Sequence, residues 1–418
     1  MKKLLLSEKE FSILMFILFF LNILLNVLNV NLSGYTEMLS IVVFILLILI
    51  NLKEKRYFRS PIYIFTFGLI IVTYLSTYLY NKDYTYTLFL PILIIIYYIF
   101  PRRVNINSLI SKDKFINLFI INMIVLIDIL SLINGKMLIG TTRLSGIFGH
   151  PNTLALFNLC GVFSVFQILL NIKNNIRFCV LVPLAFFAHV MVLTNSRTSM
   201  LVAVIYIALV LFYLLVSNRN ITAKRKLLVF SAVIMLTLVI LMIKRDSILA
   251  FLFRGGNLEG IDLKPFLNAI TSNRYYMWTK EFPYLMEGNW LIGNGVNSYL
   301  EIAYKKHMLD SIIIKDMLAS SHNFMLDIIF ISGFVGLVLF IAECILIFSE
   351  CFKRIRNSEN KSKFILNKCI IVFCMSVYFL FEVNFLWYNS FSNLFLLLNI
   401  SLIINYSFNA GKEVYDEQ

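Results

Sequence analysis

The strongest constraint on this chain is a series of twelve apolar stretches, most of them close to twenty residues long. A helix of about twenty residues crosses about 30 Å of hydrocarbon and makes all of its backbone hydrogen bonds internally, as lipid requires. With 60% hydrophobic and 14% charged residues, the chain carries more apolar surface than a soluble core could absorb. We therefore predict an all-α integral membrane protein with about twelve transmembrane helices, near residues 11–30, 36–52, 61–80, 84–101, 115–134, 151–171, 178–194, 199–217, 227–243, 323–349, 365–386 and 391–408.

The distribution of Lys and Arg predicts how these helices are oriented. With a cytoplasmic N-terminus, the inner segments hold 24 of the 37 basic residues, and the short outer loops hold only Lys82, Lys136, Arg143 and Arg197. Both termini are then cytoplasmic, and the polar segment 244–321 is a large extracytoplasmic loop between helices 9 and 10. We treat residues 1–418 as one polytopic membrane domain with that loop as an insertion. The net charge of +14 reflects this asymmetry and attraction to anionic lipid, so we expect no nucleic-acid partner.

Sequence motifs for nucleotide and metal chemistry are missing. The sequence has no GxGxxG, P-loop or HExxH pattern, and its six cysteines lie in or beside the predicted spans without zinc-type spacing. The inner loops are too short to fold a nucleotide-hydrolysing domain. We expect no metal and no cofactor, and we interpret the N-terminal apolar run as an uncleaved first helix because no small-residue cleavage site follows it.

Two outer turns carry unusual polar residues. Before the sixth span, Arg143 is followed by a glycine-containing turn and by His150, Pro151 and Asn152, with Pro151 suited to the first turn of a helix and His150 to its cap. That segment is either a simple helix start or a substrate contact. The turn 195–198 places Arg197 at the membrane surface, where it either extends toward lipid headgroups or binds a ligand.

The long loop contains an aromatic segment, 271–285, that begins with capping residues and carries Arg274 and Trp278. It would lie in the membrane interface with Tyr275, Trp278 and Phe282 facing lipid, and it is either a plain anchor or the carrier of a functional arginine. Two glycines in the segment 290–295 then indicate a tight turn or a close backbone approach.

The loop ends in Ser320-Ser321-His322-Asn323, directly before the tenth span. We expect Ser321 to cap this helix and His322 to lie in its first turn, where the helix dipole disfavours a positive imidazole. A neutral imidazole can accept a proton, so His322 is either a general base or an interfacial capping residue.

Acidic residues inside predicted spans need partners, because an ionised group in the membrane is costly. Asp128, Asp327 and Glu382 lie toward the outer ends of their spans. We expect these acids to pair with the arginines at the same depth, which are Arg143, Arg197 and Arg274.

In their order along the chain, these elements resemble the O-antigen ligase and polysaccharide-polymerase superfamily of bacterial envelope glycosyltransferases. The resemblance rests on Arg143 to Asn152 before a span, Ser196-Arg197 at a short outer turn, Arg274, Trp278 and the two glycines in the long loop, and His322-Asn323 followed by Gly333 and Gly336. It covers residues 140–340 by motif and the remainder by hydropathy only.

The resemblance implies an enzyme of the bacterial cytoplasmic membrane whose site faces outward and takes a glycan from undecaprenyl diphosphate without a metal. It implies that Arg197 and Arg274 bind the donor diphosphate and that His322 activates the acceptor hydroxyl, with Arg143, His150, Asn152 and Asn323 as further substrate contacts. We expect a repeat-unit polymerase acting with a flippase and a chain-length regulator. A ligase that transfers finished polysaccharide to a terminal acceptor, and a transporter of lipid-linked oligosaccharide, are the alternatives.

Overall fold

The computed structural model of the chain is helical in the parts it describes. Those parts contain no β-strand beyond an isolated bridge between Met137 and Leu144. It describes residues 61–80, 106–137, 142–148, 150–171, 179–217, 267, 274–275, 278–279, 288–295, 323–357, 362–382 and six residues between 395 and 403. The helices in these ranges are α3 (Pro61–Tyr80), α5 (Ile106–Asn134), α6 (Pro151–Asn171), α7 (Leu181–Thr194), α8 (Arg197–Ser217), α15 (Phe324–Asn357) and α16 (Ser362–Phe379).

Each of these helices overlaps a predicted span, although α5 begins nine residues before the predicted 115 and α15 ends eight residues after the predicted 349. Four are long and apolar enough to cross a membrane, over Asp113–Asn134, Pro151–Leu170, Arg197–Leu214 and Phe324–Ser349. α7 is shorter, at 14 residues, and α16 ends at Phe379, before the predicted boundary at 386. The predicted spans 11–30, 36–52, 84–101 and 227–243, most of the loop 244–321 and most of 391–408 lie outside the described residues. The count of twelve and the cytoplasmic termini therefore stay predictions.

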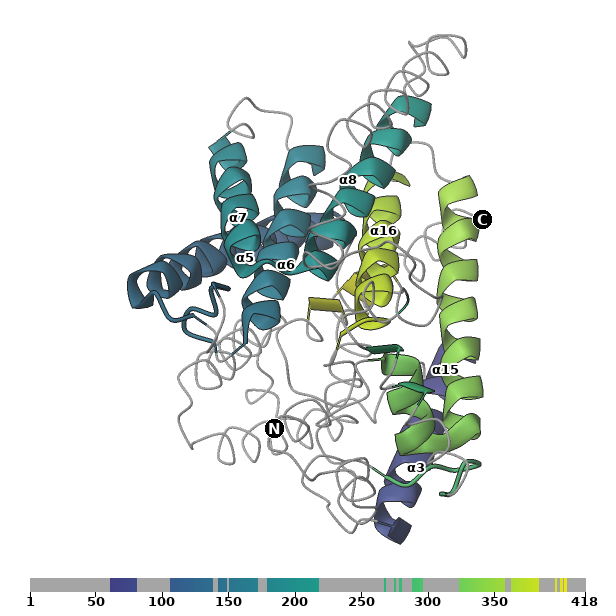
Figure 1. The fold of residues 1–418 in the computed structure, drawn as a ribbon. Coiled ribbons are helices and arrows are strands. Elements are labelled where there is room, and N and C mark those ends of the chain that lie inside the picture. The colour runs from purple at the N-terminus through teal and green to yellow at the C-terminus, as the bar shows by residue number, and fades with distance from the viewer. Residues whose placement is uncertain are drawn as a thin grey trace, which may run out of the picture.

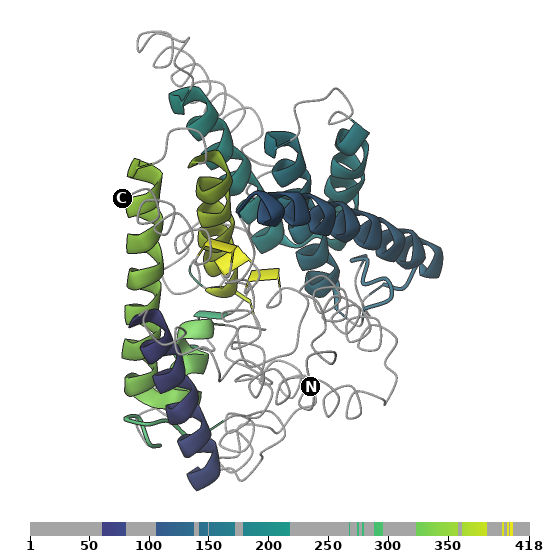
Figure 2. The same cartoon turned by 180° about the vertical axis from the view of Figure 1, so that it is seen from behind.

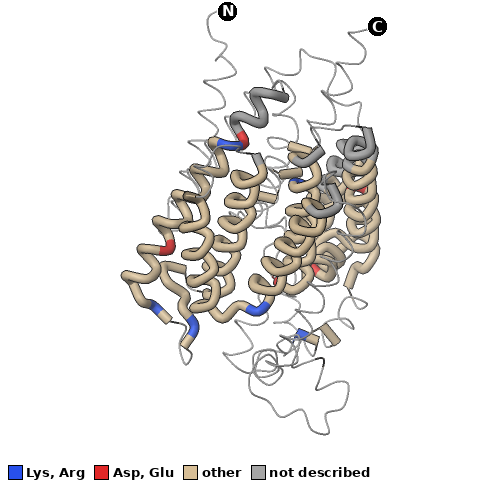
Figure 3. The backbone as a smooth tube through the Cα atoms, turned by 90° about the horizontal axis from the view of Figure 1, so that it is seen from above, with Lys and Arg blue, Asp and Glu red and all other residues tan. Residues whose placement is uncertain are grey.

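Helix α6 lies at the centre of one group of helices. It packs against α5 and α7, and also against α8 and α16 (Figure 1). Of its apolar window, 78% is buried inside the protein, against 28% for α8, so α6 is enclosed by helices while α8 has a face left for lipid. Charged residues are sparse along all of the described helices (Figure 3).

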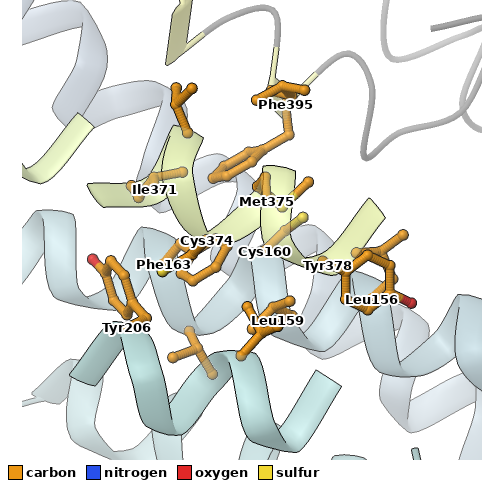
Figure 4. Close-up of a cluster of buried hydrophobic side chains, with 14 of the residues drawn as sticks. Leu156, Leu159, Cys160, Phe163, Tyr206, Ile371, Cys374, Met375, Tyr378 and Phe395 are labelled. Carbon is orange, nitrogen blue, oxygen red and sulfur yellow. The ribbon is translucent and has the colours of Figure 1, made fainter. Parts of the chain in front are cut away.

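The core of this group forms where α16 crosses α6 and α8. Phe163 of α6 packs edge-on against Tyr206 of α8 with ring centroids 4.5 Å apart, and Cys374 and Met375 of α16 lie over them (Figure 4). All four side chains are fully buried. Full burial of one such side chain contributes about 1.5–3 kcal/mol where water is the alternative, so this crossing fixes α6 and α16 against each other.

A buried ion pair joins α5 to α16 away from the outer ends of these helices. Lys368 Nζ donates to Asp113 Oδ1 at 2.6 Å, and both side chains are 2% exposed. The neighbouring Asn367 accepts a hydrogen bond from the Tyr206 hydroxyl at 2.9 Å. Because an unpaired charge at this depth would be strongly unfavourable, the two residues fix the relative position of the two helices.

Helices α3 and α15 form a second packed pair, side by side in both views (Figures 1 and 2). α15 is broken at Gly333, whose backbone has φ 66° and ψ −170°. This region is open almost only to glycine. Two carbonyls before the break and two N–H groups after it therefore lose their helical partners.

The turn 290–295 of the long loop replaces those partners. Phe334 N–H donates to Trp290 O at 2.9 Å and Val335 N–H to Leu291 O at 3.1 Å, while Phe330 O and Ile331 O accept from Asn294 N–H and Gly295 N–H at 2.7 and 3.1 Å. We call this four-bond junction the clasp. A broken helix within a membrane protein is tolerated when other backbone or side chains satisfy the freed groups. The predicted close backbone approach at the two glycines is thus confirmed.

Candidate active site

The turn between α7 and α8 supplies one wall of the candidate site. α7 ends at Asn195, which adopts the left-handed conformation with φ 49° and whose N–H donates to Val192 O at 3.0 Å. α8 then begins at Arg197, which is half-buried. Beside it, the hydroxyls of Ser196 and Ser199 are 3.0 Å apart. The predicted turn between these helices is confirmed, and it places Arg197 in the first turn of α8, while its outer location stays a prediction.

Arg143 joins this turn to the start of α6. Its Nε donates to the Thr194 carbonyl at 2.9 Å, and its Nη2 donates to Asn152 Oδ1 at 2.6 Å. The backbone N–H of Leu144 also donates to Leu193 O at 3.0 Å, so the loop before α6 is tied to the end of α7 twice. A planar guanidinium fork can make two such contacts with fixed geometry, which a lysine ammonium cannot reproduce.

His150 caps the N-terminus of α6, as its place before Pro151 predicted. Its Nδ1 accepts a hydrogen bond from Asn152 N–H at 3.2 Å, which assigns the ring proton of a neutral His150 to Nε2. The residue is exposed, although neighbouring groups withdraw part of its ring from water. That partial withdrawal from water lowers the pKa of His150, Arg143 and Arg274 lower it further, and Glu382 acts in the opposite direction. The cap therefore favours the neutral imidazole.

Glu382 draws two of the predicted site residues together. Its Oε1 accepts from Arg274 Nη2 at 2.7 Å and from Asn152 Nδ2 at 3.0 Å. The side chains of Arg274 and Glu382 are only 11% and 7% exposed, so their charges are largely withheld from water. The expected pairing of Glu382 with an outer arginine is confirmed.

Trp278 holds the Arg274 segment against the end of α16. Arg274 and Trp278 lie in helical conformation, and the Trp278 ring lies 6.4 Å from that of Phe381, the residue next to Glu382. We predicted that Trp278 faces lipid. Its half-buried side chain has the Phe381 ring as a neighbour, and that its remaining surface faces lipid stays a prediction.

Tyr378 connects the cluster to α8. Its hydroxyl donates to the Asn152 carbonyl at 3.4 Å and is hydrogen-bonded to the Ser199 side chain, and the ring is buried. Sequence reasoning missed Tyr378. The available signal was its spacing of four residues from Glu382, which on an extended α16 would put both on one face.

The structure thus gathers Arg143, His150, Asn152 and Arg274 around Glu382, with Arg197 in the adjoining turn. These residues come from the loop before α6, the start of α6, the α7–α8 turn, the end of α16 and the long loop. We call them the arginine cluster. Ends of helices distant in sequence meet here, and that this end of the bundle faces outward stays a prediction.

The expected cap of α15 is wrong. Asn323, not Ser321, caps this helix, because its Oδ1 accepts from Met325 N–H at 3.0 Å and from Leu326 N–H at 3.3 Å, and the helix begins at Phe324. Asparagine is as strong an N-cap as serine. His322 therefore precedes the cap instead of occupying the first helical turn, and its own placement lies outside the described residues.

The expectation for Asp128 is also wrong. Its Oδ1 accepts from Asn158 Nδ2 of α6 at 2.9 Å, and both residues are fully buried. Asp128 lies six residues before the end of α5, about 9 Å below it, and its side chain turns toward α6 and away from the outer arginines.

Comparison with known families gives one match, which covers part of this chain. Residues 182–341 match the family model described as O-antigen ligase, which confirms the resemblance to the O-antigen ligase and polysaccharide-polymerase superfamily. No curated protein matches the sequence. The matched region contains Arg197, Arg274 and the clasp, whereas Arg143, Asn152 and Glu382 lie outside it and join it only through the contacts described above. The described part of the chain is therefore helical, with four helices long and apolar enough to cross a membrane, and residues 182–341 are similar to the O-antigen ligase family.

Proposed function

From its O-antigen ligase domain, we propose that this membrane glycosyltransferase polymerises undecaprenyl-diphosphate-linked oligosaccharide repeat units into a surface polysaccharide. One observation carries the proposal: Arg143 and Arg274 come from separate segments and are joined through Asn152 and Glu382, beside the turn that carries Arg197, at the end of the helix bundle that the charge distribution predicts to be outside. A diphosphate leaving group requires fixed positive charge, and guanidinium groups suit phosphate oxygens. Lipid-linked donors would present their diphosphate at this depth of the bilayer.

The three arginines differ in their contacts, and this suggests different roles. Arg143 donates to Thr194 O and Asn152 Oδ1, so it shapes the site. Arg274 is bound through Nη2 alone among the described residues, which leaves further N–H groups of its fork for phosphate oxygens. We assign the donor diphosphate to Arg274 and Arg197, with Arg143, His150 and Asn152 as supporting contacts.

The reaction we propose is a substitution at the anomeric carbon of the donor sugar. The acceptor hydroxyl oxygen forms the new glycosidic bond while the bond from carbon to the diphosphate oxygen breaks. The acceptor proton passes to His322, and undecaprenyl diphosphate leaves with its added negative charge against the arginines. A positioned general base contributes about 10²–10⁴ in rate, and one charge-stabilising donor about 10²–10³.

The test is transfer by the purified protein in lipid nanodiscs given an undecaprenyl-diphosphate oligosaccharide and a metal chelator. Products of increasing length are expected, and Arg274→Ala should lower kcat/KM at least a hundredfold. Arg274→Lys should be nearly as damaging if bidentate contact matters, and a near-wild-type lysine variant would contradict that contact. Lys136→Ala, which removes an exposed outer cation, is the matched control and should retain activity.

The matched family description favours a second candidate, a ligase that transfers finished polysaccharide to a terminal acceptor. A polymerase uses a second lipid-linked unit as acceptor, whereas a ligase requires a chemically different one. Offering both acceptors to the same preparation separates the two. Movement of labelled donor between leaflets without any new glycosidic bond would instead indicate a transporter and would contradict both. Full activity of His322→Ala would contradict the assignment of His322 as the general base and leave the proposed transfer reaction standing.

A further inference from the structure

Glu382 occupies the position in which the proposed function puts a phosphate. It is a carboxylate on the guanidinium of Arg274, at 2.7 Å, and it is 5% exposed. A buried anion beside a proposed anion-binding arginine either strengthens the site by orienting the arginine or competes with the ligand for it. The contacts of Glu382 and Arg274 distinguish these two roles.

The contact between the two charges is a single-point one. Within the part of the chain that the structure describes, Arg274 donates through Nη2 only. The acceptor is Glu382 Oε1, the same oxygen that accepts from Asn152 Nδ2 at 3.0 Å. Two parallel N–H bonds from one fork to one anion are the stronger arrangement, and a phosphate group offers the oxygens for it. Arg274 can therefore exchange one bond to Glu382 for two bonds to a phosphate.

Glu382 keeps a partner after such an exchange. Asn152 remains bonded to Oε1, and Asn152 is itself fixed by Arg143 Nη2 at 2.6 Å. The carboxylate is thus not left without a hydrogen bond in a site of low exposure, where an unpaired charge would be costly. The arrangement permits Arg274 to move between two anions while the rest of the arginine cluster holds its geometry.

The charges support the same conclusion. Arg143, Arg197 and Arg274 carry three positive charges and Glu382 one negative charge, which leaves two. A diphosphate esterified at both ends, as in a lipid-linked sugar, carries two negative charges. With Glu382 ionised, the cluster and its ligand are neutral together, whereas without it the site would retain undecaprenyl diphosphate more strongly after transfer.

We propose that Glu382 is an exchangeable counter-ion of Arg274, which orients the guanidinium and competes with the diphosphate for it, so that the product is released. This inference rests on the proposed function. It predicts that Glu382→Gln, which keeps the size and an acceptor oxygen but removes the charge, binds diphosphates more tightly. The donor KM should fall, and kcat should fall with it as release of undecaprenyl diphosphate becomes slower.

The experiment measures the dissociation constants of inorganic pyrophosphate and of undecaprenyl diphosphate by calorimetry, with the full chain in nanodiscs of neutral lipid. Glu382→Gln should bind both at least tenfold more tightly than the wild type, a change of about 1.4 kcal/mol. Glu343→Gln is the matched control, because it removes a buried carboxylate of the same size from α15, outside the arginine cluster. Its affinity should equal that of the wild type.

Affinity of Glu382→Gln that is unchanged or weaker would overturn the exchange and leave Glu382 as a residue that only orients Arg274. An equal gain in Glu343→Gln would overturn it as well, since the effect would then be one of net charge. If Glu382→Gln fails to fold, Glu382→Asp, which keeps the charge but shortens the reach, should bind pyrophosphate more tightly than the wild type, and unchanged binding would count against the proposal.

Failure of the proposed function has a different outcome. If pyrophosphate and undecaprenyl diphosphate bind equally to wild type, Glu382→Gln and Arg274→Ala, the donor site itself is absent and the exchange falls with it. If the affinity for these diphosphates depends on Arg274 but is unchanged in Glu382→Gln, only the counter-ion role of Glu382 is contradicted and the donor site stands.

Discussion

Replacing Gly333 by alanine should break the clasp between the long loop and α15. Gly333 lies at φ 66° and ψ −170°, a conformation that costs an L-residue about 1–3 kcal/mol. A Cβ at this position would overlap with the Leu291 carbonyl and lie 2.6 Å from Gly293 N. Both neighbours are backbone, so neither can move aside without displacing the turn 290–295.

The cost can be worked from the bonds that such a displacement breaks. The two N–H groups beyond Gly333 donate to Trp290 O and Leu291 O at 2.9 and 3.1 Å. Each lost bond costs about 1–2 kcal/mol once the groups it leaves unpaired are included. Added to the backbone strain, the total is about 3–7 kcal/mol, a large fraction of the stability of a typical domain.

Two other glycines provide matched controls. Gly135 has φ 57°, but a Cβ there would meet nothing closer than Leu132 O at 3.9 Å, so Gly135→Ala should cost only the left-handed strain of about 1–2 kcal/mol. Gly68, inside α3, would place its Cβ 3.4 Å from a flexible Leu339 methyl, and alanine there gains about 1 kcal/mol of helix propensity.

The assay is thermal unfolding of the four proteins in the same detergent, followed by circular dichroism and by retention of a monodisperse peak. The midpoint should be lowest for Gly333→Ala, intermediate for Gly135→Ala, and at or above the wild type for Gly68→Ala. A Gly333→Ala protein that melts together with Gly135→Ala would show that the turn and α15 are not joined as described.

Two further predictions concern charges. Lys368→Met should lower the free energy of unfolding by about 3–5 kcal/mol, because it leaves the Asp113 carboxylate buried without its partner. Combining it with Asp113→Leu should restore the wild-type free energy within about 1 kcal/mol. Losses that simply add in denaturant unfolding would contradict the pairing of these two residues. The pKa of His150 is lowered from its ordinary 6.5. The hydrogen bond that its neutral ring accepts from Asn152 N–H therefore stabilises the start of α6 fully above that pH, and this stabilisation is lost as the pH falls and the ring is protonated. His150→Gln, which keeps an acceptor, should therefore lose less activity between pH 6.5 and pH 5 than the wild type, and an equal loss would refute this role for His150.

Hydropathy predicted the helices well because length and composition alone decide whether a segment spans lipid. Pro151 and the 195–198 turn fixed two helix ends to within about two residues, since a proline at the first turn and a polar turn between apolar runs have few alternatives. The same reasoning gave only the depth of a side chain. It could not separate Asp128, which faces α6, from Glu382, which follows the end of α16 and is free to turn toward Arg274.

The clasp and the site meet through the long loop. The Arg274 segment rests on the end of α16 through Trp278 and Phe381, and only about ten residues later the turn 290–295 is bonded into the break of α15. Because both contacts belong to one stretch of sequence, we expect the position of Arg274 to depend on the break at Gly333 as well as on Glu382. Gly333→Ala should therefore lower the affinity for diphosphate even at temperatures where the protein stays folded. Unchanged affinity under those conditions would mean that the contacts of Arg274 and Trp278 with the end of α16 position the arginine without help from α15.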